Sequence, residues 1–546
     1  MSFLNKLEDF LGSKDAAKKY ESKKNRLEHG DQIQILFESK TIQDLFKKEQ
    51  FTKKKSTLDA KRFRDLGNEA YKSSQDIKAL ELYSRSCQTS TNDNELALAL
   101  ANRSAAALRL GKWTTALQNV ELAIHINSYP PENLYKLHER RAKIYVHMGK
   151  KEEASSEYLR ASKLVQDPTK ASEFITLSEK SFDTFEKEII VPENAKDKGL
   201  DAISFTPNTN FPGLSNAVNI VYEDTKGRFG VATRDIQVGE YIGVEEPVVS
   251  RIKKMYQGSH CNGCMQSLED SCFLPCLHCE DANYCSLVCR SKSFESYHKY
   301  ECGLSTFLED ALIKMKGKSS EIDDYYRLGF RSISQRPMEY FRKSYNELIN
   351  ASSQLEKDQI FDQKDYKSLS SLVDNYKDDE KDNLWVQISV CFIIRSLREK
   401  GYFGESNSKK LNSKSLSNDE RIIANLCRRF IQILKYNTHG VFEAFSYKDV
   451  RSRVFANGIY SNLAMLNHSC APNVTKFFRG NKVYVLASAY ILKGTEISEN
   501  YFPYYIFMDK HTRMPWLKDH YCFECNCVAC FSNYPLLSDM QKTCPP

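Results

Sequence analysis

CNGCMQSLEDSCFLPCLHCEDANYCSLVCRSKSFESYHKYEC, residues 261–302, is a segment of this chain that is unusually rich in cysteine. It holds eight of the 17 cysteines, most of them in closely spaced pairs. Spacings of two or three residues between such ligands are typical of structural zinc sites, and a segment with so few core-forming residues needs metal to fold. We therefore expect two Zn²⁺ ions here and treat Cys272 as a non-ligand. The eight predicted ligands are Cys261, Cys264, Cys276, Cys279, Cys285, Cys289, His298 and Cys302.

The bulk composition indicates an intracellular protein of several domains. The chain has 546 residues, of which 41% are hydrophobic and 27% charged, and no apolar run approaches the length of a membrane span. Leu4, Leu7 and Leu11 predict an amphipathic helix, and neither a secretory signal nor a mitochondrial presequence is expected. Localisation in nucleus and cytoplasm is our expectation. The formal charge of +7 falls to about +2 once eleven thiolates hold three Zn²⁺ ions, so direct binding to nucleic acid or a membrane is not expected.

Residues 61–165 contain a repeat with a period slightly above 34 residues. Three segments align from Leu66, Ala101 and Arg140, with an alanine at equivalent positions in each and a glycine at the turns at 111 and 149. Small residues at these positions allow paired helices to cross closely, and the large residue four positions later fills the space between them. The pattern resembles the tetratricopeptide repeat (TPR). An unrelated helical bundle is the alternative.

Two stretches separated by more than 200 residues carry a second pattern. The first is Lys226-Gly227-Arg228 and the strand-like sequence after it; the second is LNHSCAPNV at 466–474, followed by KGTEISENYF at 493–502. Asn467 and His468 can offer main-chain and side-chain hydrogen bonds to a bound ligand, and Asn473 can lock a crossing of chain segments. These motifs resemble the SET domain of lysine methyltransferases.

The cysteine-rich stretch matches the MYND zinc finger in every spacing. A MYND finger inserted after the first SET strands identifies the chain as a member of the SET-and-MYND family, in the branch that carries tetratricopeptide repeats. This resemblance implies that Cys261, Cys264, Cys285 and Cys289 hold one ion, and that Cys276, Cys279, His298 and Cys302 hold the other. It also implies that the finger binds proteins, including proline-containing peptides.

The implied fold is a multidomain α+β protein with N-terminal helical repeats, a split β-rich SET domain, a MYND insertion, a helical insert and a cysteine-rich post-SET segment. We expect the following boundaries: an N-terminal helical segment at 1–60, repeats at 61–190, the first SET part at 210–256, the MYND finger at 261–302, the helical insert at 303–440, the SET core at 441–505 and the post-SET segment at 506–546.

The same resemblance supplies a third zinc site and the active-site residues. Cys525, Cys527 and Cys530 lack a fourth ligand, which the family provides from the position of Cys470; Cys522 has no matching position. Tyr501 matches the catalytic tyrosine, whereas a packed strand aromatic is the structural alternative. S-adenosylmethionine is the implied cofactor. Its expected contacts are Lys226, Gly227, Arg228, Asn467, His468, Tyr501, Tyr521 and Phe523.

Methyl transfer requires a neutral lysine amine, and lysine has an ordinary pKa of about 10.4. A narrow, largely apolar channel beside a cationic sulfonium favours the neutral amine, so the sequence predicts no strong general base. The main contribution expected of the protein is alignment of nitrogen, methyl carbon and sulfur, with the hydroxyl of Tyr501 orienting them.

Three departures from the family pattern weaken the enzyme hypothesis. Phe229 stands where many SET domains have a second glycine at the cofactor loop, and His439 stands where relatives often have asparagine, with Asn437 two residues earlier. Only 16 residues follow Cys530, so the C-terminal helical lobe of larger relatives is not expected. The competing hypothesis is a catalytically weak SET-fold scaffold or transcriptional regulator that recruits partners through the repeats and the finger.

The repeats also offer residues of the types that grip the acidic tails of heat-shock chaperones. A cluster of cations and amides suits a terminal carboxylate together with a side-chain carboxylate. A solvated helix face is the structural alternative, since lysine and arginine are frequent there. The predicted partner-binding residues are Arg64, Asn68, Asn102, Lys136 and Arg140.

Overall fold

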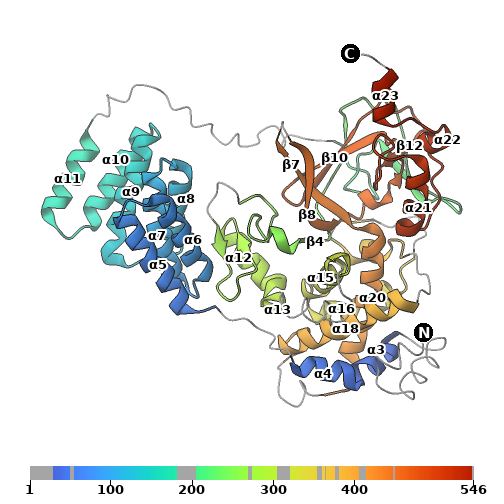
Figure 1. Cartoon of the computed structure of the whole chain (residues 1–546), viewed down its shortest axis with the longest axis horizontal. Coiled ribbons are helices and arrows are strands. Elements are labelled where there is room, and N and C mark those ends of the chain that lie inside the picture. Colours follow the sequence, from blue (N-terminus) through green and yellow to red (C-terminus); the bar gives the residue numbers. More distant parts are fainter. Residues whose placement is uncertain are drawn as a thin grey trace. The chain divides into compact units, whose positions relative to one another are not determined.

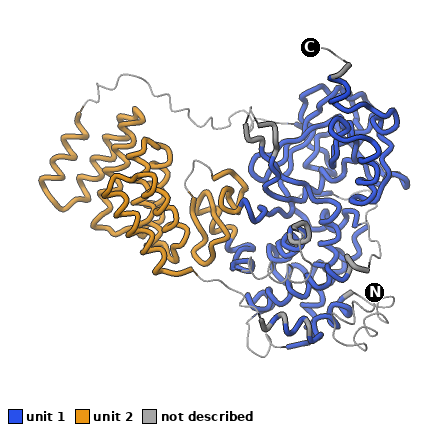
Figure 2. The backbone as a smooth tube through the Cα atoms, in the orientation of Figure 1, with its two compact units in different colours: residues 1–51, 203–256, 294–546 blue, residues 52–202, 257–293 orange. Residues whose placement is uncertain are grey.

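The computed structural model describes residues 29–48, 55–180, 205–268, 273–303, 320–352, 360–362, 364–374, 380–404, 413–446 and 449–543. The predicted helix around Leu4, Leu7 and Leu11 and the residue Cys272 lie outside these ranges. The chain divides into two compact units, one comprising 1–51, 203–256 and 294–546 and the other 52–202 and 257–293 (Figure 2). Among the described residues, no helix is long and apolar enough to cross a membrane.

Helix pairs form most of the second unit, as the repeat predicts (Figure 1). Ala79, Ala116 and Ala154 are each fully buried, and a Cβ on Gly67 would lie 2.6 Å from the ring of Tyr83, so close helix crossing requires small residues at these points. The pairs are α5 (Thr57–Lys72) with α6 (Asp76–Thr89), α7 (Asp93–Arg109) with α8 (Trp113–His125), and α9 (Leu134–His147) with α10 (Lys151–Leu164), followed by α11 (Pro168–Glu179).

The turns inside the second and third pairs are made by glycine. Gly111 and Gly149 have φ of +69° and +70°, a conformation that residues with a Cβ adopt only with strain. The predicted equivalence of these two positions is therefore confirmed.

The first part of the finger belongs to the same unit as the repeats. It consists of the short strands β5 (Leu274–Pro275) and β6 (Asn283–Tyr284), which pair antiparallel, and α12 (Leu287–Ser293). Arg290 forms an ion pair with Asp93 of α7 at 2.9 Å, and Gln88 of α6 donates to the Glu280 carbonyl at 2.8 Å. These contacts join the finger to the C-terminal end of α6 and the N-terminal end of α7.

Small sheets make up the predicted SET domain in the first unit (Figure 1). One has the order β1 (Val218–Glu223), β2 (Gly227–Ala232), β12 (Glu496–Glu499), β9 (Asn467–His468). A second has the order β10 (Val474–Arg479), β11 (Lys482–Ala487), β3 (Tyr241–Glu245). A third has the order β4 (Val249–Ile252), β8 (Asp449–Ile459), β7 (His439–Ser446), so the strands of the SET core begin two residues before the predicted boundary at 441.

Helices fill the predicted insert between the finger and the SET core. They are α15 (Ser320–Ser334), α16 (Met338–Ile349), α17 (Tyr366–Ser370), α18 (Glu380–Glu399) and α20 (Asn418–Asn437), while a π-helical segment (Phe294–His298) and α13 (Lys299–Glu301) precede them. Ser417 caps α20 in a capping box with Glu420, which satisfies backbone N–H groups at the start of this long helix. α21 (Lys510–Tyr521), α22 (Val528–Phe531) and α23 (Leu537–Thr543) form the post-SET segment.

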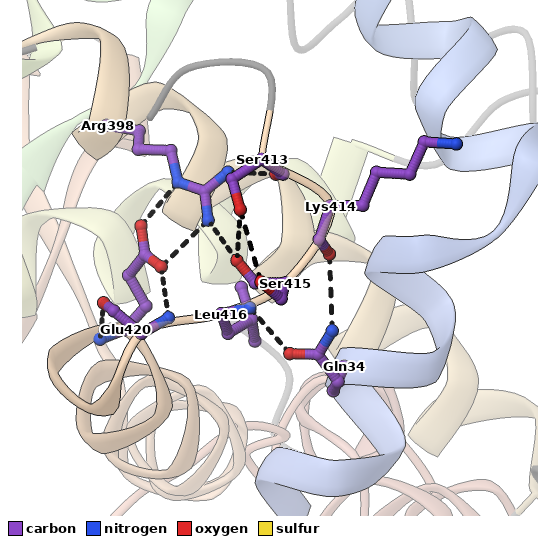
Figure 3. A network of polar contacts seen from close by, with 8 residues as sticks. Gln34, Arg398, Ser413, Lys414, Ser415, Leu416 and Glu420 are labelled. Carbon is purple, nitrogen blue, oxygen red and sulfur yellow. Dashed lines mark hydrogen bonds and ion pairs between the residues drawn. The ribbon is translucent and has the colours of Figure 1, made fainter. Parts of the chain in front are cut away.

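The N-terminal helices α3 (His29–Glu38) and α4 (Lys40–Lys48) pack into this insert, although about 370 residues separate them from α20 in sequence. Ile33 and Leu36 of α3 are fully buried. Gln34 bonds the main chain of Lys414 and Leu416, and nearby Arg398 binds both carboxylate oxygens of Glu420 (Figure 3). Residues 29–48 are therefore structural parts of the helical insert, which the sequence does not indicate.

Candidate functional site

Two Cys/His groups form within residues 261–302. Four thiols of the first group, and three thiols with one imidazole of the second, each place their ligand atoms within 4.8 Å of one another. The donor types and number suit a closed tetrahedral Zn²⁺ site in each case. The first group is Cys261, Cys264, Cys285 and Cys289, and the second is Cys276, Cys279, His298 and Cys302, so the interleaved pairing implied by the resemblance is the one observed.

A third group joins the NHSC motif to the post-SET segment. The Sγ atom of Cys470 lies 3.6 Å from that of Cys530 and 3.9 Å from that of Cys525, and Cys527 completes the set. The buried Arg513 of α21 donates to the Cys530 thiol at 3.5 Å, which places a positive charge beside a group that becomes anionic on binding metal. Cys522 lies outside the group, as expected.

The four-stranded sheet brings the two predicted cofactor-binding stretches together. β12 pairs antiparallel with β2 and parallel with β9, which places Ile497 opposite Gly230 and Ser498 opposite Asn467. Asn473 locks this crossing, because its side-chain amide donates to the Glu496 carbonyl at 2.8 Å and accepts from the Ser498 N–H at 2.9 Å. The role predicted for Asn473 is confirmed by these contacts.

Lys226, Gly227 and Asn467 meet at the edge of this sheet. The Asn467 amide donates to the Lys226 carbonyl at 3.3 Å, and the Lys226 ammonium pairs with Glu496 at 3.0 Å. Gly227 has φ of +68° and no atom within 4 Å of the place where a Cβ would lie, so the loop leaves open space on that side. The next residue differs: the Arg228 side chain is buried, donates to the Ser371 carbonyl at 2.8 Å and stacks over Phe361.

Tyr501 lies where β12 leaves the sheet and is held at both ends. Its hydroxyl donates to the Leu466 carbonyl at 2.8 Å, and its backbone N–H donates to Nδ1 of His468 at 3.0 Å. Burial raises the pKa of the Tyr501 hydroxyl well above its usual value, so the group stays protonated. His468 is also buried, which lowers its pKa to about 4 and keeps the imidazole neutral.

Aromatic rings from the post-SET segment surround this pair. The ring of Tyr521 lies 5.1 Å from that of Tyr501, and the ring of Phe523 lies 5.9 Å from that of His468, centre to centre. Tyr521 is the last residue of α21, Phe523 lies two residues after it, and both precede the candidate zinc ligands Cys525 and Cys527. The third Cys group therefore fixes the segment that carries both rings.

A pocket opens beside Tyr501, and its walls are more polar than the apolar channel expected from the sequence. Tyr501 and Tyr521 lie on its wall together with the buried carboxylate of Glu499. His439 Nε2 lies 2.9 Å from one Glu499 oxygen, and the Lys476 ammonium contacts the other. The full lining is Tyr436, Asn437, Thr438, His439, Gly440, Ala464, Lys476, Glu499, Asn500, Tyr501 and Tyr521.

In the repeats, the predicted partner-binding residues lie on the first helices of the three pairs. Asn68 accepts a hydrogen bond from the Asn102 amide at 2.9 Å, and Arg140 donates to the carbonyl of Ala101 and the hydroxyl of Ser104. Nη1 of Arg64 is buried without a partner among the described residues. Lys136 is exposed and bonds Asn133 at 2.6 Å, one helical turn before Arg140.

The family comparison matches a region that lies mainly in the first unit. A model of the SET domain matches residues 227–502, which include β2, Tyr501 and every lining residue of the pocket except Tyr521. The chain belongs to the SET domain family. The match begins at Gly227 and ends at Phe502, so it spans both halves of the split SET domain and the insertions between them.

Relatives of this SET protein carry the SMYD name, as the SET-and-MYND resemblance predicts. The chain is 25% identical to protein-lysine N-methyltransferase SMYD4 of Mus musculus, over 86% of this chain and 66% of that protein. It is 24% identical to SMYD4 of Homo sapiens, again over 86% and 66%. Histone-lysine N-methyltransferase SMYD3 of Mus musculus is 22% identical over 55% of this chain and 58% of its own length. The chain thus spans about two thirds of the length of the SMYD4 relatives.

Among solved structures, the first TPR of Spaghetti (RPAP3) bound to the HSP90 peptide SRMEEVD aligns with 22% identity. The alignment covers 22% of this SET protein and 92% of that chain, with a TM-score of 0.20. The helix pairs of the second unit are assigned from the bounds of the helices and the contacts between them, and this alignment is not used for that assignment.

Sequence reasoning missed, among other lining residues, the two charged residues of the SET pocket. Glu499 and Lys476 lie 23 residues apart, and only the pairing of β12 and β10 with their neighbours brings their side chains together. His439 was noticed solely as a departure from the family pattern. A glutamate two residues before the predicted catalytic tyrosine was the available signal, because an acid at a buried strand position requires a partner for its charge.

Proposed function

We propose that this SET protein is an S-adenosylmethionine-dependent protein-lysine N-methyltransferase. The observation that carries the proposal is the position of Tyr501. Its neutral hydroxyl is fixed beside a pocket, where the strand that begins at Gly227 and the NHSC motif meet in one sheet. The names of the SMYD relatives support the same reaction. The substrates are proposed to be lysine side chains of histone or non-histone proteins.

The donor set around the cofactor loop fits the amino-acid end of S-adenosylmethionine. Gly227 leaves open space, and Asn467 and His468 lie directly across from the loop on β9. Lys226 would add a positive charge near a cofactor carboxylate, and Tyr521 and Phe523 would add aromatic faces for the adenine. Arg228 would contribute its main chain, because its side chain is bonded to Ser371.

The residues of the pocket orient the reactants. When bound, S-adenosylmethionine supplies an electrophilic methyl carbon on a sulfonium. Tyr501 would hold the lysine nitrogen in line with that carbon, and Tyr521 would narrow the opening so that only an extended, unbranched side chain enters. Fixing the reacting atoms in this way replaces a bimolecular encounter and contributes several kcal/mol of the barrier, on the order of 7–11 in well-oriented systems.

Incubation with methyl-tritiated cofactor and cell lysate, comparing wild type with Tyr501→Phe, tests the proposal. We expect labelled protein only with wild type. Equal labelling by both proteins would remove Tyr501 from the mechanism. Cofactor binding without any labelling would instead favour the scaffold, in which the repeats and the finger recruit partners and the buried Arg228 and Phe229 mark a weakened cofactor loop.

Three Zn²⁺ ions are proposed as structural cofactors, one in each of the three Cys/His groups. The finger is proposed to bind proteins, including proline-containing peptides, and the protein is proposed to act in nucleus and cytoplasm. Metal analysis of the purified protein, with three ions per chain expected, checks the first of these statements.

Chaperone-tail binding is a second proposed function, located in the repeats. Asn68 and Asn102 touch, Arg140 lies against the same turn of α7, and the unpartnered Nη1 of Arg64 needs an acceptor. An acidic peptide ending in a free carboxylate would supply acceptors for all of them. Because Arg140 is bonded into the repeats, Lys136→Glu is a cleaner test than a change at Arg140. We expect a loss of affinity by calorimetry for an acidic tail peptide; unchanged affinity would contradict the clamp.

A further inference from the structure

Glu245, the last residue of β3, has a buried carboxyl group with no cation beside it. The residue is 2% exposed, and the carboxyl group forms no ion pair with the residues that the structure describes. Its partners are hydrogen-bond donors of residues 461–463. Oε1 accepts from the Asn462 N–H at 2.9 Å and the Ser461 hydroxyl at 3.2 Å, and Oε2 accepts from the Leu463 N–H at 2.9 Å. Because an unpaired acid is costly to bury, these hydrogen bonds are what makes its position tenable.

The donors lie at the start of η4 (Leu463–Met465), a short 3₁₀ helix between β8 and β9. The first N–H groups of a helix have no partner within it, so an acceptor from outside is needed to hold this turn. Asn462 holds the same turn from two further sides. Its fully buried side chain accepts from the Gly213 N–H at 3.0 Å and donates to the Phe361 carbonyl at 2.8 Å. Side chains therefore fix the position of this turn.

A continuous series of hydrogen bonds runs from Glu245 to the hydroxyl of Tyr501. Leu463 donates its N–H to Glu245, and its carbonyl accepts from the Leu466 N–H at 3.0 Å. The Leu466 carbonyl in turn accepts from the Tyr501 hydroxyl at 2.8 Å. Asn467 follows directly, and its amide donates to the main chain of the proposed cofactor loop. Hydrogen bonds in such a series strengthen one another, so a change at one end affects the other.

We propose that Glu245 is a positioning residue of the methyltransferase site, and that its ionised carboxylate sets the place of Tyr501 and Asn467 through this series. The inference rests on the proposed function, in which Tyr501 and Asn467 are assigned to the substrate and the cofactor. Glu245 acts only through the turn, since its own hydrogen bonds go to residues 461–463.

The protonation state of Glu245 decides how well the turn is held. An ionised carboxylate only accepts hydrogen bonds, whereas a protonated carboxyl group carries an O–H that meets one of the three donors. Burial raises the pKa of the Glu245 carboxyl to about 7, although its hydrogen bonds act to lower that pKa. The series to Tyr501 should therefore be complete above about pH 7 and weakened below it.

The titratable groups near Glu245 are neutral or paired with each other. Tyr460, directly after β8, faces the carboxyl group; burial and the charge of Glu245 raise the pKa of Tyr460 well above its usual value, so this hydroxyl stays neutral. From the sheet, Val483 of β11 lies opposite Glu245. The adjacent Glu246 and Lys482 pair with each other at 3.3 Å, and both side chains are half-exposed.

Activity and stability should respond to this proton in opposite ways. The ordinary pKa of the carboxyl group is 4.5, but in the folded chain the group keeps its proton up to about pH 7. The folded state therefore binds more protons than the unfolded state between these values, and its stability falls as the pH rises through that window. Methyl transfer should instead rise as the pH passes about 7, because the ionised form holds the turn. A residue with a structural role alone would change activity and stability together.

The first experiment measures methyl transfer from tritiated S-adenosylmethionine to core histones and poly-L-lysine, between pH 6 and pH 9, by the full chain and by Glu245→Gln. The ratio of the two rates at each pH cancels the ionisation of the substrate lysine. At pH 8.5 we expect wild type to be faster by about tenfold or more, because small displacements of reacting groups slow a reaction strongly. At pH 6 the two rates should be nearly equal, since Glu245 is then protonated. A ratio that stays constant with pH would overturn the proposal.

Glu246→Gln is the matched control, because it removes the same charge one residue along the chain from a half-exposed pair. It should keep the wild-type rate at every pH, and a loss equal to that of Glu245→Gln would overturn the proposal. Thermal unfolding at each pH checks that the proteins are folded at the assay temperature. If Glu245→Gln does not fold, Ser461→Ala replaces it. That change removes a hydrogen bond that lowers the pKa of Glu245, so the rise in rate should move to higher pH; an unmoved midpoint would overturn the proposal.

Affinity for S-adenosylhomocysteine, measured by calorimetry, gives a readout without turnover. We expect Glu245→Gln to bind this ligand about threefold more weakly than wild type at pH 8.5, the effect of weakening one hydrogen bond at Asn467. The two affinities should agree at pH 6, and equal affinities at both pH values would overturn the proposal. If wild type binds the ligand but methylates neither probe, the proposed function fails, and the difference in affinity still decides the role of Glu245.

Discussion

The hydroxyl of Tyr501 donates a hydrogen bond to the main-chain carbonyl of Leu466 at 2.8 Å, which ties the end of β12 to the residue just before the NHSC motif. This bond explains how a tyrosine at the edge of a sheet keeps one orientation beside a pocket. It also means that the hydroxyl is structural as well as a group proposed to contact the substrate.

Tyr501→Phe should therefore have two effects. Methyl transfer should fall by about 100-fold or more, as when one preorganised hydrogen-bond donor is removed from an active site. Stability should fall by about 1–3 kcal/mol, because the buried Leu466 carbonyl loses its partner. Urea unfolding and the tritium assay measure the two effects. Tyr490→Phe, which removes an exposed bond to Asp235, is the control and should change neither by much. Full activity in Tyr501→Phe would contradict the assignment.

Removing one thiol should empty the third zinc site alone. In Cys470→Ser the remaining three cysteines, Cys525, Cys527 and Cys530, lack the ligand that connects them to the SET core. We expect two Zn²⁺ ions per chain in place of three, and weaker cofactor binding, because Tyr521 and Phe523 are no longer fixed beside His468 and Tyr501. Metal analysis and calorimetry measure these changes. Cys522→Ser, outside the group, should retain three ions.

Gly230 should not tolerate a side chain. A Cβ at this position would lie 2.5 Å from Cδ2 of Leu466, at the point where β2 meets the segment before the NHSC motif. Gly230→Ala should destabilise the SET unit by about 1–3 kcal/mol through overpacking and should displace Leu466, which accepts the Tyr501 bond. Thermal unfolding measures the loss. Gly258→Ala meets nothing within 4 Å and should leave the midpoint unchanged.

Two neighbouring acids at the start of α20 should differ sharply in importance. Glu420 pairs with Arg398 where both side chains are nearly fully buried, whereas Asp419 pairs with the half-exposed Arg342 (Figure 3 shows the first pair). Glu420→Ala should cost about 3–5 kcal/mol, since it leaves a buried guanidinium without its carboxylate. Asp419→Ala should cost less than about 1 kcal/mol. Chemical denaturation compares them, and equal losses would contradict this account of the insert.

The sequence indicates those parts of the molecule whose chemistry depends on residue type and local spacing. Zinc ligands are Cys or His at short intervals, so the spacing predicted the eight ligands of the finger and three of the post-SET site. The division of the eight into two groups, and Cys470 as the fourth post-SET ligand, came from the family resemblance. Ala79, Ala116 and Ala154 were predicted to lie at helix crossings, because the repeat places small residues there, and all three are fully buried. The role of Asn473 at the chain crossing was predicted from the residue types of the LNHSCAPNV motif.

Other features depend on contacts between residues far apart in the chain. The N-terminal helix α3 has no signal that links it to α20, because a buried helical face says nothing about the partner that covers it. Arg228 was expected at the cofactor, yet its side chain bonds the carbonyl of Ser371, 143 residues away.

By itself the sequence determined that this chain holds helical repeats and a finger with eight metal ligands, since these follow from periodicity and from ligand chemistry, and the resemblance of two motifs implied the SET fold. Only the tertiary structure decided the character of the pocket. Glu499, His439 and Lys476 come from three different strands, and each alone reads as an ordinary polar residue. Their meeting point exists because strand pairing buries the Glu499 carboxylate, and a buried carboxylate is stable only where it has partners such as His439 and Lys476.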